Sequence, residues 1–312
     1  NESKSNVNQF FKRFIKEEHT KSKTEIVAAS ISLVDASVII QNQNKSKDNA
    51  QRFTALNADI QNFRIVGDVI SADIQQLNTQ TNWHDTALTS LAGTYQFSPT
   101  QMKLENAVIQ TKESVLDVDI RLTYPKGGLK DFVDNVSLNI DLKPSSIGTS
   151  DLIKIMPNWK GQFVEIKGTI DGPVYDFATK GVQIRHQSNT VNFDGKIKNI
   201  LNEDSRSLEV DLKIDAAKNM VSIPFALSAE VSEFLMRLDD FSTDAKVILH
   251  DKLWNVKADL ITALGRMQSN ATFALDSKVS DFSINLASDD FDIGKLTAVP
   301  TIVRTGLGVV VS

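Results

Sequence analysis

Apolar and polar residues alternate along most of the chain, and a period of two predicts β-strands. The alternation is unbroken over residues 116–124 and again over 136–142. The residues between the apolar positions are mostly charged or polar, so one face of each strand is aliphatic and the other faces water. The same pattern returns in six later segments, at residues 164–170, 191–197, 208–214, 225–231, 254–260 and 282–286. The sequence therefore predicts a long sheet with a single apolar face.

Turn signals separate these segments, and they favour an all-β fold. Polar or Pro/Gly-rich stretches occur at residues 41–52, 98–99, 125–128, 171–173 and 202–205. Connections long enough for a helix are missing between the strands, so we expect mainly antiparallel pairing. Helical periodicity occurs near the beginning, where five apolar residues fall on one stripe between residues 6 and 16. The predicted fold is an elongated, repetitive, mainly antiparallel β-groove with one short N-terminal amphipathic helix, within residues 1–20.

An internal repeat predicts the domain organisation. Residues 138–157 match residues 282–300 at an offset of 144, and a short polar link followed by a strand comes after each copy. This repeat divides the chain into a first β-groove repeat, 24–157, and a second, 158–312. The second copy ends within a strand, and the chain begins with Asn1. We therefore expect a partial chain whose parent protein continues with further strands of the same kind.

Composition and motifs exclude several classes of function. The 312 residues carry a net charge of −5, which argues against electrostatic binding to nucleic acid. Cysteine is absent, which excludes disulfides and thiolate sites, and no nucleotide-binding or nucleophile motif occurs. The four histidines have no metal-ligand spacing, and the acidic cluster of Asp289, Asp290 and Asp292 lacks the order of a calcium loop. We expect no catalytic residue, no cofactor and no metal, so the chain is not predicted to be an enzyme.

Four segments carry a resemblance to a known family. Residues 53–81, 91–124, 129–142 and 167–197, together with the N-terminal helix, resemble the TamB (translocation and assembly module) branch of the AsmA-like proteins. The likeness covers nearly the whole chain, but its motifs are loose strand patterns. It implies a β-taco-like groove in the periplasm of a double-membraned bacterium, in a protein anchored in the inner membrane. It also implies an outer-membrane partner of the Omp85 barrel class. The anchor and the part that would meet this partner lie outside the chain.

The resemblance implies a function as well. Such proteins look like bridge-like conduits that carry phospholipids between the inner and outer membranes, and they are also linked to outer-membrane protein assembly. An open groove for acyl chains needs a wall of aliphatic side chains, and Val, Ile and Leu dominate the apolar positions here. The predicted lipid groove consists of Leu116, Val118, Ile120, Leu122, Val136, Leu138, Ile140, Leu142, Val164, Ile166, Ile170, Val191, Phe193, Leu208, Val210 and Leu212. The alternating charged residues, such as Asp117 and Asp119, are expected to keep the opposite face soluble.

The core of a closed β-sandwich would consist of the same kinds of residue, so a second interpretation stays open. In it the chain is a structural or protein-assembly β-rod with a filled core, which acts with the same Omp85-class partner. Phospholipid that co-purifies with the protein would distinguish the conduit from the rod.

Either interpretation predicts an elongated molecule. About sixteen antiparallel strands spaced roughly 4.8 Å apart give a sheet on the order of 75 Å long. Small-angle X-ray scattering should therefore give a radius of gyration well above that of a compact 312-residue globule. A scattering profile typical of a sphere would contradict the predicted groove and the predicted rod alike.

Overall fold

The computed structural model describes residues 25–40, 50–81, 87–148, 151, 163–199, 202, 205–217, 237–274, 282–297, 299 and 305–311. The chain separates into two compact units, residues 1–145 and 146–312. The repeat boundary predicted between residues 157 and 158 lies outside the described residues, and so do the predicted helix within residues 1–20 and the predicted strand at 225–231.

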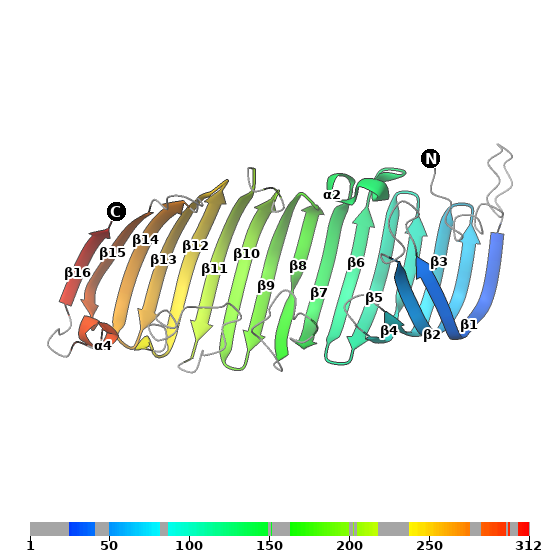
Figure 1. Ribbon diagram of the computed structural model, residues 1–312, viewed down its shortest axis with the longest axis horizontal. Helices are drawn as coiled ribbons and strands as arrows, with labels where there is room; N and C mark the ends of the chain where they lie inside the picture. The colour runs from blue at the N-terminus through cyan, green and yellow to red at the C-terminus, as the bar shows by residue number, and fades with distance from the viewer. Residues whose placement is uncertain are drawn as a thin grey trace. The chain divides into compact units, whose positions relative to one another are not determined.

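The first unit is a meander of antiparallel strands. Its strands are β1 (Glu25–Ile40), β2 (Gln51–Val66), β3 (Val69–Thr81), β4 (Ala87–Ser98), β5 (Gln101–Thr111) and β6 (Val115–Thr123), and β7 (Ser137–Gly148) begins in it. Two short helical turns, η2 (Gly128–Asp131) and α2 (Phe132–Asn135), connect β6 to β7. Each strand pairs with its neighbours in the chain, and the strands are labelled in Figure 1.

The second unit repeats this plan. Its strands are β8 (Phe163–Pro173), β9 (Asp176–His186), β10 (Asn189–Lys198), β11 (Ser207–Ala216), β12 (Phe241–His250), β13 (Leu253–Thr262), β14 (Gly265–Ala274), β15 (Phe282–Phe291) and β16 (Thr305–Val311). The short helix α4 (Ile293–Thr297) lies between β15 and β16. Strand order again follows the chain, and the neighbouring strands from β8 to β16 pair antiparallel. The all-β, antiparallel fold predicted from the alternation is thus confirmed.

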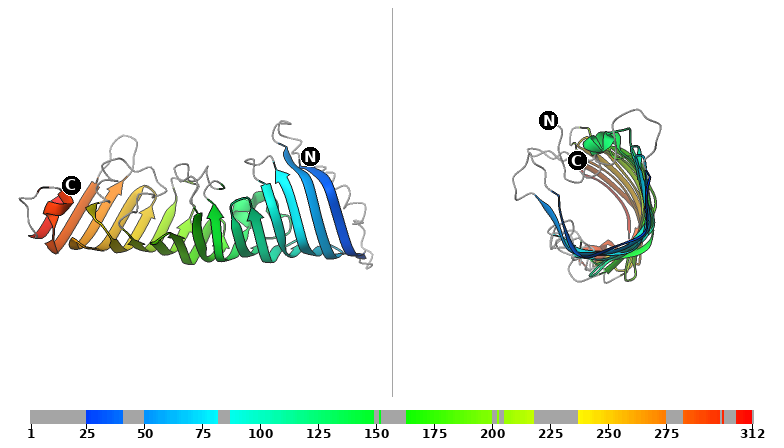
Figure 2. Two further views of the ribbon diagram at one scale, coloured as in Figure 1. Left: turned by 90° about the horizontal axis from the view of Figure 1, so that it is seen from below. Right: turned by 90° about the vertical axis from the view of Figure 1, so that its right-hand side faces the viewer.

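Five β-bulges with the same geometry interrupt strands in the described part of the chain. In each, one residue has a positive φ angle, and the two residues that flank it on one face of the sheet are three positions apart instead of two. The positive-φ residues, with their φ angles and flanking residues, are Asp35 (48°, Leu33 and Ala36), Ala55 (50°, Phe53 and Leu56), Asn62 (52°, Ile60 and Phe63), Asn106 (51°, Leu104 and Ala107) and Gly181 (60°, Thr179 and Val182). The inserted residue keeps both flanking side chains on the same face of the sheet and bends the strand. Figure 2 shows that the strands are curved along their length.

In three bulges, a side chain of the adjacent strand accepts the backbone N–H of the positive-φ residue. Asp35 donates to Asn57 Oδ1 at 2.9 Å, Asn106 to Asp119 Oδ1 at 2.5 Å, and Gly181 to Asp194 Oδ1 at 2.6 Å. An extra residue in a bulge has no opposite residue in the ladder, so its N–H needs another acceptor. The polar face thus supplies hydrogen-bond acceptors that hold the bend in place.

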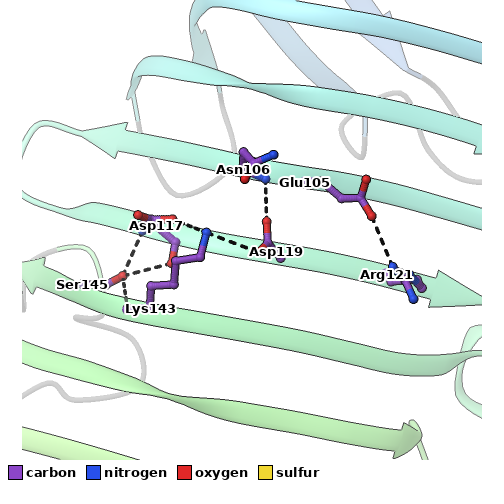
Figure 3. Close-up of polar contacts among 7 residues, drawn as sticks. All are labelled: Glu105, Asn106, Asp117, Asp119, Arg121, Lys143 and Ser145. Carbon is purple, nitrogen blue, oxygen red and sulfur yellow. Dashed lines mark hydrogen bonds and ion pairs between the residues drawn. The ribbon is translucent and has the colours of Figure 1, made fainter.

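Asp119 has two roles in this arrangement (Figure 3). Besides accepting the N–H of Asn106, its carboxylate lies 3.3 Å from Lys143 Nζ, which is also 3.2 Å from Asp117. The hydrogen bond from Asn106 and then the Lys143 ammonium lower the pKa of Asp119, and partial desolvation opposes this shift. Asp119 is therefore more than the solubilising charge that the sequence indicates.

Asp119→Ala should destabilise the first unit. The lost hydrogen bond leaves the bulge N–H of Asn106 without its acceptor, which should lower the free energy of unfolding by about 1 kcal/mol in urea denaturation followed by circular dichroism. Because the pKa of Asp119 is lowered in the folded state, its carboxylate stabilises the fold at pH values above the ordinary pKa of aspartate. This stabilisation is lost as the pH falls through the lowered pKa of the folded state. The difference between the wild type and Asp119→Ala should therefore shrink in acid.

Asp141→Ala is the matched control, because Asp141 is an exposed aspartate of the neighbouring strand β7. Its free energy of unfolding should stay within about 0.5 kcal/mol of the wild type. Equal losses in the two variants would show that the bulge acceptor at Asp119 has no special role.

Candidate functional site

The apolar face of the first unit is built from rows of side chains that follow the hydrogen-bonded register. One row crosses six strands, from β1 to β6, and consists of Ile26, Ile65, Ile70, Phe97, Met102 and Leu122. A neighbouring row joins Ala72, Tyr95, Leu104 and Ile120 from β3 to β6. Directly opposite residues on one face of paired strands pack against each other, so each row is a continuous apolar contact.

These side chains are only partly shielded from solvent. Val118 and Leu122 are buried, whereas Leu104, Leu116 and Ile120 are half-buried. A pocket of about 340 Å³ opens on this face, and its lining consists of Ile74, Leu91, Tyr95, Met102, Lys103, Leu104 and Ile120. Burial raises the pKa of the Tyr95 phenol, which therefore stays neutral at physiological pH. An apolar hollow is thus present at the centre of the first unit.

The second unit carries a wider apolar face, made of four rows. The Trp254 row consists of Phe177, Ile197, Leu208, Leu249, Trp254 and Phe273. The Val210 row consists of Thr179, Gly195, Val210, Val247, Val256, Ala271 and Ile284. The Leu212 row consists of Val182, Phe193, Leu212, Ala245, Ala258, Ser269 and Leu286. The Val191 row consists of Ile166, Ile184, Val191, Ile214, Thr243, Leu260 and Met267.

Three hydroxyl groups interrupt these four rows, from Thr179, Thr243 and Ser269. The other side chains are aliphatic or aromatic, and most of them are half-buried. Within the described part of the chain, the strands pack mainly against their neighbours in the sheet, and no element lies across the middle of either apolar face. Each unit is therefore a single layer over this part of the chain.

One rim of the second apolar face is closed by a small core. Leu238, Leu264 and Phe291 are buried together, and Leu260 and Met267 of the Val191 row pack against them. Ile293 and Leu296 of α4 complete the cluster, and Asp292 caps this short helix by accepting the N–H of Lys295 at 3.0 Å. The acidic cluster at residues 289–292 thus includes a helix cap.

The opposite face of the second unit is charged and contains a long furrow of about 1080 Å³. Most strands of the unit line this furrow with three residues, namely the residue of the Leu212 row and the two residues that flank it, such as Asp211 and Lys213. Successive side chains of a strand point to opposite faces, so the flanking polar residues form the walls and the backbone forms the floor. Cross-strand ion pairs order this face: Lys246 lies 2.6 Å from Glu209 and holds the pKa of that carboxyl below its usual value.

The predicted groove residues lie on strands β6, β7, β8, β10 and β11 or directly next to them. Leu116, Val118, Ile120 and Leu122 lie on β6, and Leu138, Ile140 and Leu142 on β7, which Val136 precedes. In the second unit, Val164, Ile166 and Ile170 lie on β8, Val191 and Phe193 on β10, and Leu208, Val210 and Leu212 on β11. The register between β10 and β11 places Val191, Phe193, Leu208, Val210 and Leu212 on one face. That all sixteen residues line one groove remains a prediction.

Sequence reasoning missed the contributions of several strands to the apolar faces. In the first unit β2 to β5 supply Ile65, Ile70, Phe97 and Met102, and in the second β9 supplies Val182 and Ile184. The bulges at Asn62, Asn106 and Gly181 shift the alternation by one residue in β2, β5 and β9, which hides the strand pattern. The spacing of three between apolar residues around a central Asn, Asp or Gly is the signal that could have revealed them.

Comparisons with protein-family models, with curated proteins and with solved structures found no match to the chain. Among the described residues, no helix has both the length and the apolar character needed to cross a bilayer. In the same residues, no group of three His, Asp or Glu side chains is placed to hold a metal ion. The apolar faces of the two units are the candidate functional site.

Proposed function

We propose that the protein is a lipid conduit, in which phospholipid acyl chains lie on the apolar faces of the two units and move along them. The observation that carries this proposal is the set of aliphatic rows, which run across up to seven strands and stay half-exposed in a single-layer sheet. In an ordinary sandwich a second sheet would cover such rows.

The physical chemistry of these faces suits an acyl chain. Each methylene group that leaves water for an apolar surface gains about 0.8 kcal/mol, and this gain does not depend on orientation. Rows of Val, Ile, Leu and Ala present few polar atoms that would hold a chain at one point. A bound chain can therefore shift from one strand to the next at little cost in free energy.

The resemblance to the TamB branch of the AsmA-like proteins supports the wider setting of the proposal. In that setting the protein lies in the periplasm, is anchored in the inner membrane, and meets an Omp85-class barrel in the outer membrane. It would carry phospholipids between the two membranes and so contribute to outer-membrane biogenesis. The alternative, a protein-assembly rod with a filled core, requires that the rows be covered and closed to lipid.

Val210→Asp should block lipid on the second apolar face. Val210 is half-buried at the centre of its row, so a carboxylate there would have to be desolvated by any acyl chain that passes. Crosslinking of the protein to a phospholipid with a photoreactive acyl chain, in cells that lack redundant transporters, should fall by about tenfold or more. Ile140→Asp on β7 tests the face of the first unit in the same way.

Asn192→Asp is the matched control, because it adds one carboxylate to the charged face of the adjacent strand β10. Asn192 Oδ1 already accepts a hydrogen bond from Gln183 at 2.8 Å, and a carboxylate oxygen keeps this role. This variant should crosslink like the wild type. If Val210→Asp and Ile140→Asp fold by circular dichroism and keep their crosslinks, the conduit is wrong and the filled rod is the better account.

A further inference from the structure

The Trp254 row forms the rim of the second apolar face that lies opposite α4. Its members on β12 and β13, Leu249 and Trp254, are each one residue away from the pair His250 and Leu253 that closes the hairpin. The rings of Trp254 and Phe273 are stacked, with centroids 6.0 Å apart and planes at 9°. This row is therefore the boundary between the aliphatic rows and the polar hairpin ends.

Polar groups occupy the hairpin ends beyond this rim. Arg206 donates its Nε–H to the backbone oxygen of Asp251 at 3.2 Å, and Lys198 lies 3.9 Å from Asp176. Tryptophan is favoured at such boundaries, because its ring is apolar and its indole N–H needs an acceptor. The rim thus has the chemistry of the zone where the apolar and polar parts of a lipid meet.

The indole N–H of Trp254 is buried, and it has no hydrogen-bond acceptor among the residues that the structure describes. Buried donors in folded proteins are nearly always satisfied, so this one calls for an explanation. The hydroxyl of Thr179, in the neighbouring Val210 row, is buried in the same way. Thr179 is 8% exposed, and its Oγ1 has no hydrogen-bond partner within the described residues. Both atoms belong to the half of the apolar face that lies away from α4.

The opposite rim of this apolar face, beside α4, is apolar where it borders β13 and β14. There Leu238, Leu264 and Phe291 are buried, with Ile293 and Leu296 packed against them, and this apolar cluster covers the edge. A lipid whose acyl chain lies across the rows of β13 and β14 would therefore have its polar end at the Trp254 row. This orientation brings the first polar atoms of the lipid next to the indole.

We infer that Trp254 donates its indole N–H to the ester carbonyl of an ester-linked lipid bound on the second apolar face. This inference rests on the proposed function and adds a lipid class and an orientation to it. A carbonyl is the favoured acceptor because it is neutral and joins the acyl chain directly, whereas a phosphate would carry its charge into a buried site. Thr179, four strands away, offers a second donor of the same kind.

The experiment compares two soluble short-chain lipids that differ only in the carbonyl groups, dihexanoyl phosphatidylcholine and its di-O-hexyl ether analogue. Both are titrated below their micellar concentrations into the full chain, with the three indole N–H signals followed by ¹H–¹⁵N NMR. Trp83→Phe, Trp159→Phe and Trp254→Phe assign these signals. Trp254→Phe keeps an aromatic ring in the stack and removes the donor, together with part of the ring surface that both lipids contact.

We expect the wild type to bind the ester lipid about fivefold more tightly than the ether lipid, the ratio that one neutral hydrogen bond provides. The indole signal of Trp254 should move on addition of the ester lipid and move far less with the ether lipid. In Trp254→Phe the two lipids should bind with equal affinity, at or below the level of the ether lipid in the wild type. Trp83→Phe should keep the fivefold preference.

Two negative results are distinguishable. If the wild type binds both lipids equally and Trp254→Phe changes neither affinity, the hydrogen bond from Trp254 is refuted while the conduit stands. If neither lipid binds the wild type, the conduit itself fails, and the inference fails with it.

Discussion

Pairing of each strand with its neighbours in the chain is the constraint on which the rest of this structure depends. In a single-layer meander, the side chains of one strand meet those of the next strand and no second sheet. Apolar contact must therefore be made sideways, along rows that stay in register from strand to strand. Leu212, for example, lies between Phe193 and Ala245 in the ladder, and a slip of β11 by one residue would place Leu212 on the charged face.

The bulges show how strands of up to 16 residues keep this register while they bend. Each inserts one residue with positive φ, so that the next apolar side chain returns to the same face. The displaced N–H is accepted by a polar side chain in three cases, as with Asn106 and Asp119. The charged face thus has a structural task beside solubility, since its carboxylates fix the curvature that shapes the apolar face.

The same rows serve as core and as candidate site, and this has a physical consequence. A side chain such as Val210 stabilises the sheet through its row neighbours and at the same time presents a half-exposed methyl surface to any bound molecule. In the proposed conduit, stability and lipid binding would therefore depend on one set of contacts, and acyl chains would complete a core that the described part of the protein leaves open. The indole N–H of Trp254 is buried without an acceptor among the described residues, and in the inferred complex the bound lipid would supply one.

Much of this architecture is readable from the sequence, and the physical reason is local. Alternation with period two depends only on the geometry of one strand, so β6, β10 and β11 and the face of Leu116, Val191 or Leu212 follow directly from their residues. Short polar links between strands likewise determine antiparallel pairing. The strands β2, β5 and β9 do not show an unbroken period of two, because the inserted residue Asn62, Asn106 or Gly181 shifts the alternation within the strand. Tertiary structure alone decided which residues share a row, that Asp119 accepts a bulge N–H, and that the Trp254 donor is buried without an acceptor in the described residues. Each of these depends on the register between strands, a relation between distant parts of the chain that no single strand contains.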